Sequence, residues 1–208
     1  VFEDVRVDAV KIGMVATAGI AQAIADRLEA HGAQNIVVDP VMVATSGDPL
    51  LAADAVAAVT TRLLPLATVA TPNLPEAAKL IGAAPIRTLA EMRAAMPALL
   101  GLGAGWVLLK GGHLEESGEA VDLLGHAASG QIVELRARRV ATKNTHGTGC
   151  TLSSALAASL PGRSVPEAMV GLARYFAFYN SRRPHRAFGG ITPDQTYFGN
   201  LPQLRTAA

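Results

Sequence analysis

The chain has 208 residues, of which 50% are hydrophobic, and its formal net charge at pH 7 is +1. A charge this small argues against nucleic acid or a membrane surface as the main partner of the whole chain. One cysteine permits no internal disulfide, and we find neither a signal-peptide pattern nor an apolar run long enough to span a bilayer. We therefore expect a cytoplasmic, globular protein with one sizeable α/β domain.

Short apolar strands alternate with helical patterns along most of the chain. The predicted strands are 7–15, 35–40, 67–72 and 105–112, and the predicted helices are 17–32, 50–64, 74–81 and 88–101. This alternation is typical of a parallel sheet with helices on both faces. The connection between 119–125 and 131–140 is short enough for a hairpin, which predicts an antiparallel pair at the edge of the sheet.

Residues 147–150 read Gly-Thr-Gly-Cys just where a helix is expected to begin. Helix N-termini bind anions through unpaired N–H groups, and glycines let those groups approach a phosphate closely. The alternative is a tight turn in which Cys150 is a small buried apolar residue. Neither the Walker A pattern nor the dinucleotide pattern G-x-G-x-x-G is present, so those two classes of phosphate site are excluded.

Four polar residues lie at or just after the C-terminal ends of predicted strands, at the edge where open α/β sheets bind ligands. Asp39 could orient a metal or a substrate hydroxyl, or it could cap backbone amides. Asn73 and Glu76 form an oxygen-rich pair suited to water-mediated Mg²⁺, but they also match a helix N-cap and its capping-box partner. Lys110 could reach a ligand, or it could be a lysine with a buried stem and a solvated head.

Aromatic residues are distributed very unevenly along the chain. Seven of the nine lie between Tyr175 and Phe198, and residues 1–174 hold only Phe2 and Trp106. This step in composition predicts a junction near residue 175.

Five segments, in this order and at these intervals, carry a resemblance to a known family: "KIGM", "DPVMVATSGDPLL", "TPNLPEA", "LLKGGH" and "NTHGTGCTLSSAL". Together they resemble the hydroxymethylpyrimidine/phosphomethylpyrimidine kinases of thiamine biosynthesis, and the match covers roughly residues 1–175. The resemblance implies a ribokinase-like three-layer α-β-α sandwich with a mostly parallel sheet. It also implies that ATP, with Mg²⁺, phosphorylates 4-amino-5-hydroxymethyl-2-methylpyrimidine and then its monophosphate.

The resemblance also implies roles for individual residues. An anion hole would lie on Gly147, Thr148, Gly149 and Cys150, with the Cys150 thiol as the base that acts on the substrate hydroxymethyl. Lys110 would contact the ATP phosphates.

The other implied roles concern the nucleotide, the metal and the pyrimidine. They are Thr145 at the nucleotide, Asn73 and Glu76 in the Mg²⁺ shell, Asp39 in the metal and phosphate region, and Met14 and Val41 in the pyrimidine pocket.

The sequence departs from the family pattern at its N-terminus. Family members begin with a strand and a glycine-rich segment that forms much of the pyrimidine site, and nothing in this sequence corresponds to it. We expect that a segment is missing before Val1 and that the sheet is therefore incomplete next to the predicted strand 7–15. The edge of that strand would then be exposed. We also expect that these 208 residues keep some affinity for Mg-ATP but do not complete the transfer.

The second departure lies in the C-terminal segment. Residues 178–198 resemble the end of an insertion-sequence transposase with an integrase-type core, without its acidic catalytic residues. We predict a kinase domain at 1–175 and a transposase-like tail without its own core at 176–208. The tail shows no sustained helical period, and its cluster of Arg182, Arg183 and Arg186 could bind nucleic acid weakly.

Two other functions remain open from the sequence. One is another ribokinase-like kinase, such as a pyridoxal kinase, which shares the GTGC-type helix start. The other is a non-enzymatic remnant that binds nucleic acid through residues 178–198. A homodimer like that of the family would be in doubt for a truncated chain.

Overall fold

The computed structural model describes residues 1–42, 51–112, 114, 119–138, 147–186 and 189–199. The chain divides into two compact units, Val1–Gly162 and Arg163–Ala208.

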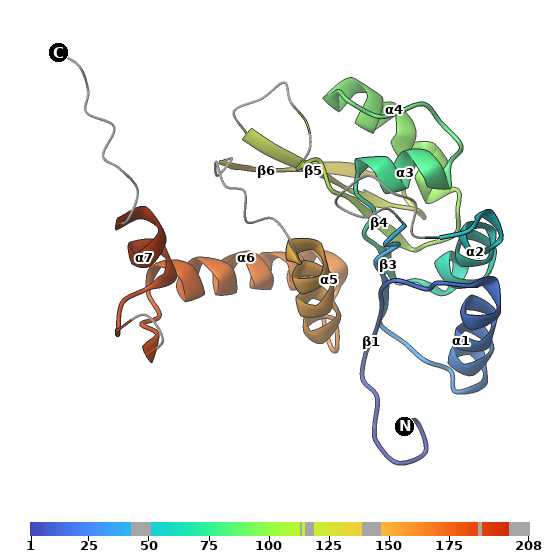
Figure 1. The fold of residues 1–208 in the computed structure, drawn as a ribbon, viewed down its shortest axis with the longest axis horizontal. Helices are drawn as coiled ribbons and strands as arrows, with labels where there is room; N and C mark the ends of the chain where they lie inside the picture. The colour runs from blue at the N-terminus through green and yellow to red at the C-terminus, as the bar shows by residue number, and fades with distance from the viewer. Residues whose placement is uncertain (43–50, 113, 115–118, 139–146, 187–188, 200–208) are drawn as a thin grey trace. The chain divides into compact units, whose positions relative to one another are not determined.

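A six-stranded sheet forms the centre of the first unit, and its strands follow one another in chain order (Figure 1). The strands are β1 (Val10–Ile12), β2 (Ile36–Val38), β3 (Val69–Ala70), β4 (Trp106–Leu109), β5 (Glu119–His126) and β6 (Ile132–Arg138). The first four are parallel, and β5 and β6 add an antiparallel pair. The predicted parallel sheet with an antiparallel pair at its edge is confirmed. Among the described residues, β1 lies at the other edge and pairs only with β2.

The helices of this unit are α1 (Ala18–Ala30), α2 (Ala53–Ala58), α3 (Leu74–Leu80), α4 (Leu89–Leu100) and α5 (Thr148–Ser159). The helix predicted at 50–64 is correct in place but not uniform. After α2 the chain forms a π-helical turn, η1 (Val59–Leu63), and a 3₁₀ turn, η2 (Leu64–Leu66). Pro65 has no N–H to continue an α-helix, which accounts for the tightened end.

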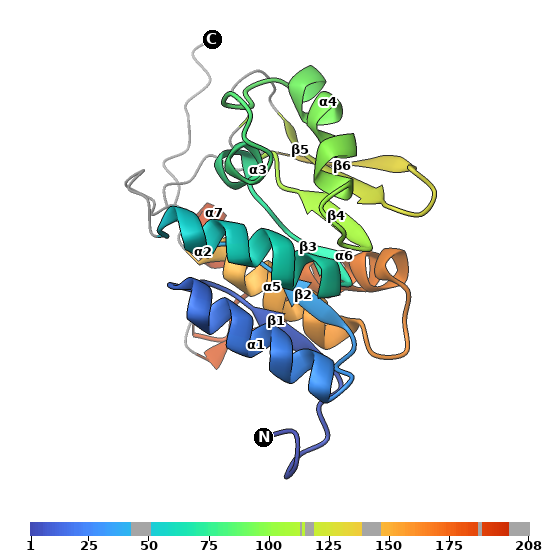
Figure 2. The same cartoon turned by 90° about the vertical axis from the view of Figure 1, so that its right-hand side faces the viewer.

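Helices cover both faces of the parallel strands. In Figure 1, α1 and α2 lie on one face and α5 lies on the other, and Figure 2 shows α1 and α2 side by side. The buried residues of α1 are Ala21, Ala25 and Leu28, spaced so that one stripe of the helix faces the core. The first unit is therefore a three-layer sandwich, in agreement with the predicted fold class.

Gly111, two residues after the end of β4, has no room for a side chain. A Cβ atom there would overlap the carbonyl oxygen of Val121 and press on Met92. We predict that Gly111→Ala lowers the free energy of unfolding by about 1–3 kcal/mol, because the backbone must shift to relieve the overlap. Urea unfolding would measure the loss. Gly112→Ala is the matched control, since nothing lies near its Cβ position, and an equal effect of both variants would contradict the prediction.

Within its described residues, the second unit contains two helices, α6 (Val165–Ser181) and α7 (Pro193–Gly199), which contact each other. The compositional step at residue 175 lies inside α6, so it coincides with no break in the helix. The origin of residues 176–208 stays a prediction.

The sequence analysis underestimated the regular structure in this second unit. Residues 193–199 form α7, because the N–H of Gln195 donates to the Thr192 hydroxyl at 3.2 Å and the Gln195 side chain accepts from the N–H of Thr192 at 2.9 Å. The pattern Thr-x-x-Gln was visible in the sequence and could have predicted this helix start. No helix within the described ranges has the length and apolar character to cross a membrane.

Candidate functional site

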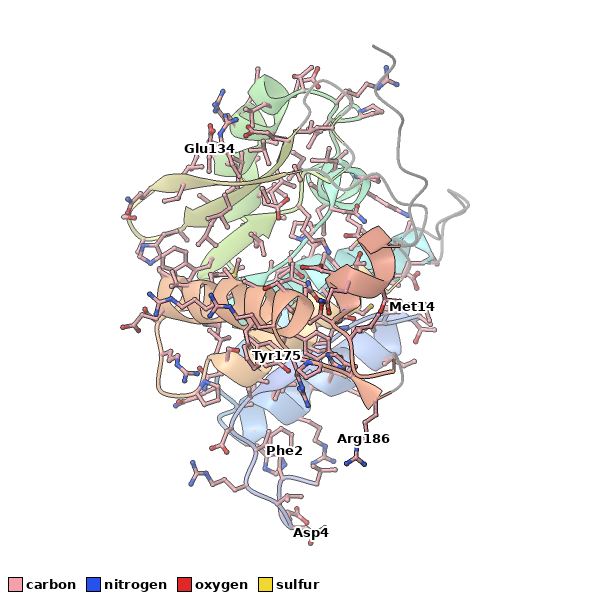
Figure 3. All side chains as sticks on the ribbon, turned by 90° about the vertical axis from the view of Figure 1, so that its left-hand side faces the viewer. Phe2, Asp4, Met14, Glu134, Tyr175 and Arg186 are labelled. Carbon is pink, nitrogen blue, oxygen red and sulfur yellow. The ribbon has the colours of Figure 1, made fainter. Side chains whose placement is uncertain are left out.

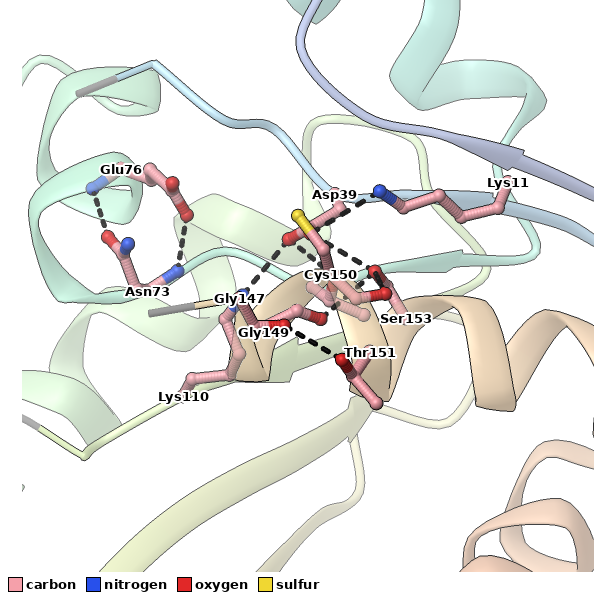
Figure 4. Close-up of polar contacts among 11 residues, drawn as sticks. Lys11, Asp39, Asn73, Glu76, Lys110, Gly147, Gly149, Cys150, Thr151 and Ser153 are labelled. Atoms are coloured by element: carbon pink, nitrogen blue, oxygen red, sulfur yellow. Dashed lines mark hydrogen bonds and ion pairs between the residues drawn. The ribbon is translucent and has the colours of Figure 1, made fainter. Parts of the chain in front are cut away.

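Polar residues from three parallel strands meet at one edge of the sheet, next to the start of α5 (Figure 4). Asp39 follows β2, Asn73 follows β3 and Lys110 follows β4. The backbone holds the last two together, because Asn73 and Lys110 form a parallel bridge and the N–H of Lys110 donates to the carbonyl of Pro72 at 2.9 Å. The carboxyl ends of parallel strands meet at one edge, so the topology itself gathers these residues.

Asp39 is the centre of the site, with only 1% of its surface exposed. The Lys110 ammonium donates to Oδ1 at 3.0 Å, and the hydroxyl of Thr71 lies 3.1 Å from the same oxygen. The Ser153 hydroxyl lies 3.1 Å from Oδ2, and the Lys11 ammonium lies 3.8 Å from it. The expected alternative for Asp39, a carboxylate that caps backbone amides, does not describe these contacts, since its partners here are side chains.

Two lysines share this single buried carboxylate, so Asp39 alone does not balance both positive charges. The side chains of Lys110 and Lys11 are only 16% and 20% exposed. Their charges are therefore weakly screened by water. The cluster is suited to an anionic ligand, and the expected alternative of a lysine head in solvent does not fit Lys110.

The first turn of α5 lies against this cluster. Gly147 is the N-cap with φ 78°, a left-handed conformation that favours glycine, and it supplies no side-chain cap. A side chain at Gly149 would lie 3.2 Å from the Lys110 ammonium, so the glycine lets the two approach each other. Cys150, in the same turn, is exposed. The alternative in which Cys150 is a buried apolar residue is therefore wrong, and the turn is open to an anion.

Asn73 and Glu76 form the capping box that one interpretation of the sequence predicted. The Asn73 side chain accepts from the N–H of Glu76 at 2.9 Å, and Glu76 accepts from the N–H of Asn73 at 2.8 Å. Glu76 is 3% exposed, and burial raises its pKa, although the backbone N–H of Asn73 and the charge of Lys110 oppose that change. The pair thus begins α3 and places a carboxylate near Lys110.

These residues do not fit a metal held by the protein alone. No group of three His, Cys, Asp or Glu side chains that could hold a metal occurs within the described part of the chain. Both oxygens of Asp39 already contact lysines and hydroxyls, and Asn73 and Glu76 bond each other. The predicted metal roles of Asp39, Asn73 and Glu76 stay predictions.

The raised pKa of Glu76 predicts how stability depends on pH. As pH rises above 4.5, the ordinary pKa of glutamate, Glu76 loses its proton in the unfolded state before it does so in the folded state. The free energy of unfolding therefore falls as pH rises from 4.5 through the raised pKa of Glu76. We predict that Glu76→Gln flattens this fall and unfolds at a higher temperature than wild type at pH 7, since glutamine keeps the capping box.

Glu91 is the control for this prediction, because its pKa is shifted in the opposite direction. It occupies the same capping-box position on α4, and hydrogen bonds from the N–H groups of Arg87 and Thr88 lower its pKa. The stability that Glu91 contributes is present above pH 4.5 and is lost as pH falls through its lowered pKa. Glu91→Gln should therefore lower the melting temperature at pH 7. Melting curves between pH 4 and 8 that shift in the same direction for both variants would contradict this prediction.

A narrow apolar crevice lies beside β1 and β2, and it is lined in part by Gly13, Val41, Met42 and Leu51. The predicted place of Val41 in a substrate pocket stays a prediction. The crevice as it stands has no room for a water molecule, so it would have to open to admit a ring. Met14 does not line it and is 57% exposed (Figure 3).

Three residues of the site were not predicted from the sequence. Lys11, Thr71 and Ser153 all contact Asp39. Ser153 could have been found, since it follows Gly149 by four residues and so lies one turn further along the same helix face. Thr145, predicted at the nucleotide, lies outside the described residues.

Asp122, on β5, fixes the turn that follows Lys110. Its Oδ1 accepts the N–H of Gly111 at 2.8 Å. Burial raises the pKa of this carboxyl, and the Gly111 hydrogen bond and the charge of Lys110 act against the change. Asp122 therefore belongs to the support of Lys110, and nothing in its spacing along the sequence indicated this.

Comparisons with known proteins show the family of the chain. The family model described as phosphomethylpyrimidine kinase matches residues 1–186. The chain is 50% identical to the hydroxymethylpyrimidine/phosphomethylpyrimidine kinase of Salmonella typhimurium, over 92% of this chain and 73% of that protein. It is 52% identical to the Escherichia coli enzyme of the same name, over 77% of this chain and 59% of that protein. It therefore spans about three fifths to three quarters of these relatives.

A solved structure gives the same fold. The ADP complex of Bacillus subtilis pyridoxal kinase superposes with a TM-score of 0.74 at 34% identity, covering 88% of this chain and 67% of that one.

Proposed function

Because the chain belongs to the phosphomethylpyrimidine kinase family, we propose that it transfers the γ-phosphoryl group of ATP to 4-amino-5-hydroxymethyl-2-methylpyrimidine and then to the resulting monophosphate. The reaction would supply the pyrimidine diphosphate of thiamine biosynthesis, and we place it in the cytoplasm. One observation carries the proposal: a lysine paired with a buried carboxylate lies against an open helix N-terminus.

Phosphoryl transfer depends mainly on positioning and on neutralising charge. Lys110 supplies a cation whose direction is fixed by Asp39, and the first-turn amides of α5 supply N–H donors beside it. The Ser153 hydroxyl lies within hydrogen-bonding distance of both Asp39 and the carbonyl of Gly149, so it ties α5 to the strand edge. These groups would hold the transferring phosphoryl group.

The Cys150 thiol would act as the base for the acceptor hydroxyl, because it is exposed in the same turn of α5. Mg²⁺ would arrive on the phosphates of ATP and supply further charge neutralisation, with Glu76 reaching it through water.

A pyridoxal kinase is the second candidate, because a solved pyridoxal kinase shares the fold. Sequence identity favours the pyrimidine, at 50% and 52% for the two pyrimidine kinases and 34% for the pyridoxal kinase.

Transfer of radioactive phosphate from ATP to each acceptor tests the proposal. In a chain extended at its N-terminus by the family's strand and glycine-rich segment, we expect label on the hydroxymethyl and phosphomethyl pyrimidines and less on pyridoxal. Preferential labelling of pyridoxal would contradict the pyrimidine assignment. An extended chain that binds ATP but labels no acceptor would contradict the proposed activity, whereas the 208 residues alone are expected to bind ATP without completing the transfer.

Removing the Lys110 ammonium should weaken ATP binding. A hydrogen bond to a charged group contributes about 1.5–3 kcal/mol, so we predict a loss of about 10- to 100-fold for Lys110→Ala in calorimetric titrations. Asp39 keeps Lys11 as a counter-ion in this variant, which favours correct folding. Lys79→Ala, on α3, is the control for loss of a lysine. Unchanged affinity in Lys110→Ala would remove Lys110 from the nucleotide site.

We also propose that residues 1–175 carry this function and that Arg182, Arg183 and Arg186 give at most weak binding to nucleic acid. Replacing all three with glutamine should abolish any salt-sensitive retention of a DNA oligonucleotide on filters. Retention that persists in this variant would show that the arginines are not its source.

A further inference from the structure

Lys11 is a second lysine in the site, and its ammonium group lies farther from Asp39 than that of Lys110 does. It lies on β1, its side chain is 20% exposed, and its nitrogen is 3.8 Å from Asp39 Oδ2. Lys110, by comparison, donates a hydrogen bond to Asp39 at 3.0 Å. Among the residues that the structure describes, the Lys11 ammonium donates no hydrogen bond, although it carries three N–H donors. A largely buried cation with unused donors is costly unless a ligand meets it.

The Lys11 ammonium lies close to the backbone of Gly13. A Cβ atom at Gly13 would lie 2.8 Å from the Lys11 nitrogen, so a side chain there would push the flexible end of Lys11 aside. Gly13 and Val41 also line the apolar crevice, which Lys11 does not line. Lys11 contacts Oδ2 of Asp39 from β1, whereas Lys110 contacts Oδ1 and lies against Gly149 at the start of α5.

This arrangement gives the two lysines different neighbours. Lys110 lies where the phosphates of ATP would meet α5, and Lys11 lies at the other carboxylate oxygen of Asp39. Asp39 neutralises only one of the two lysine charges, so a second anion can be accommodated beside Lys11. The two proposed acceptors differ in this respect: the hydroxymethyl compound is neutral at its reacting group, and the phosphomethyl compound is anionic.

We propose that Lys11 binds the phosphate of the phosphomethyl acceptor and so serves the second phosphoryl transfer rather than the first. The inference rests on the proposed function. The donors of Lys11 would take up the acceptor phosphate while Lys110 stays with the nucleotide. Lys11 thus allows one site to accept both a neutral alcohol and a phosphate monoester.

Binding of the two acceptors to variants of the chain tests this inference. Each pyrimidine is titrated calorimetrically into the protein with a non-hydrolysable ATP analogue present. We expect Lys11→Gln to bind the phosphomethyl compound about tenfold more weakly than wild type and to bind the hydroxymethyl compound equally well. Lys11→Arg keeps the charge and should recover most of the affinity. Lys79→Gln should match wild type.

The outcomes separate this inference from the proposed function. Equal losses for both acceptors in Lys11→Gln would mean that Lys11 only maintains the site, and no loss for either would mean that it is not used; each result overturns the inference alone. A wild-type chain that binds the ATP analogue but neither pyrimidine contradicts the proposed function, and the inference falls with it. Thermal unfolding of each variant checks that the fold is retained.

Discussion

In a chain extended at its N-terminus by the family's strand and glycine-rich segment, Cys150→Ser should lower kcat for the hydroxymethyl pyrimidine by about 100-fold and leave KM for ATP nearly unchanged. A general base contributes roughly 10²–10⁴ to the rate and acts only as the acceptor loses its proton, so its loss appears in turnover and not in nucleotide binding. The exposed position of Cys150 in the first turn of α5 permits that role. Steady-state kinetics with both substrates varied would measure the change.

Ser154→Ala is the control for this experiment, because Ser154 is exposed on the same helix and should be replaceable without effect. If kcat of Cys150→Ser equals that of wild type, the thiol takes no part in proton transfer. An increase in KM for ATP at constant kcat would instead assign Cys150 to nucleotide binding.

Asp39→Ala should cost about 3–5 kcal/mol of folding free energy, the range expected when one partner of a buried ion pair is removed. The substitution leaves Lys11 and Lys110 with unbalanced charge and takes an acceptor from Ser153. Urea unfolding would report the loss as a lower midpoint.

A surface aspartate provides the comparison for Asp39. Asp8 pairs with Arg6, and both side chains are largely exposed, so Asp8→Ala should change stability by less than about 1 kcal/mol. Similar unfolding midpoints for Asp39→Ala and Asp8→Ala would show that the buried pair does not organise the site.

The fold could be predicted from the sequence because its elements have strong local signals. Pro40 ends the segment that contains β2, and the apolar run at 105–110 contains β4 and ends at Lys110. The lengths of the strands could not be predicted, since β1 keeps only Val10–Ile12 of the expected 7–15. Pairing with a neighbour decides where a strand ends, and the sequence of one strand does not contain that information.

The site was predictable only where a residue ends a strand or begins a helix. Asp39, Asn73, Lys110 and Gly147 do so, and the topology brings them to one edge. Lys11 was missed because it lies inside a strand pattern, where a lysine is usually solvated.

The central claim is that the first turn of α5 binds the phosphates of ATP. Amide signals in ¹H–¹⁵N correlation spectra, followed during a titration with ATP, test it most directly. We expect large shifts at Gly149 and Cys150 and none at Gly19 and Ile20, which begin α1, a helix of similar length whose N-terminus is capped by Thr17. Equal shifts at both helix starts, or no shift at α5, would contradict the claim.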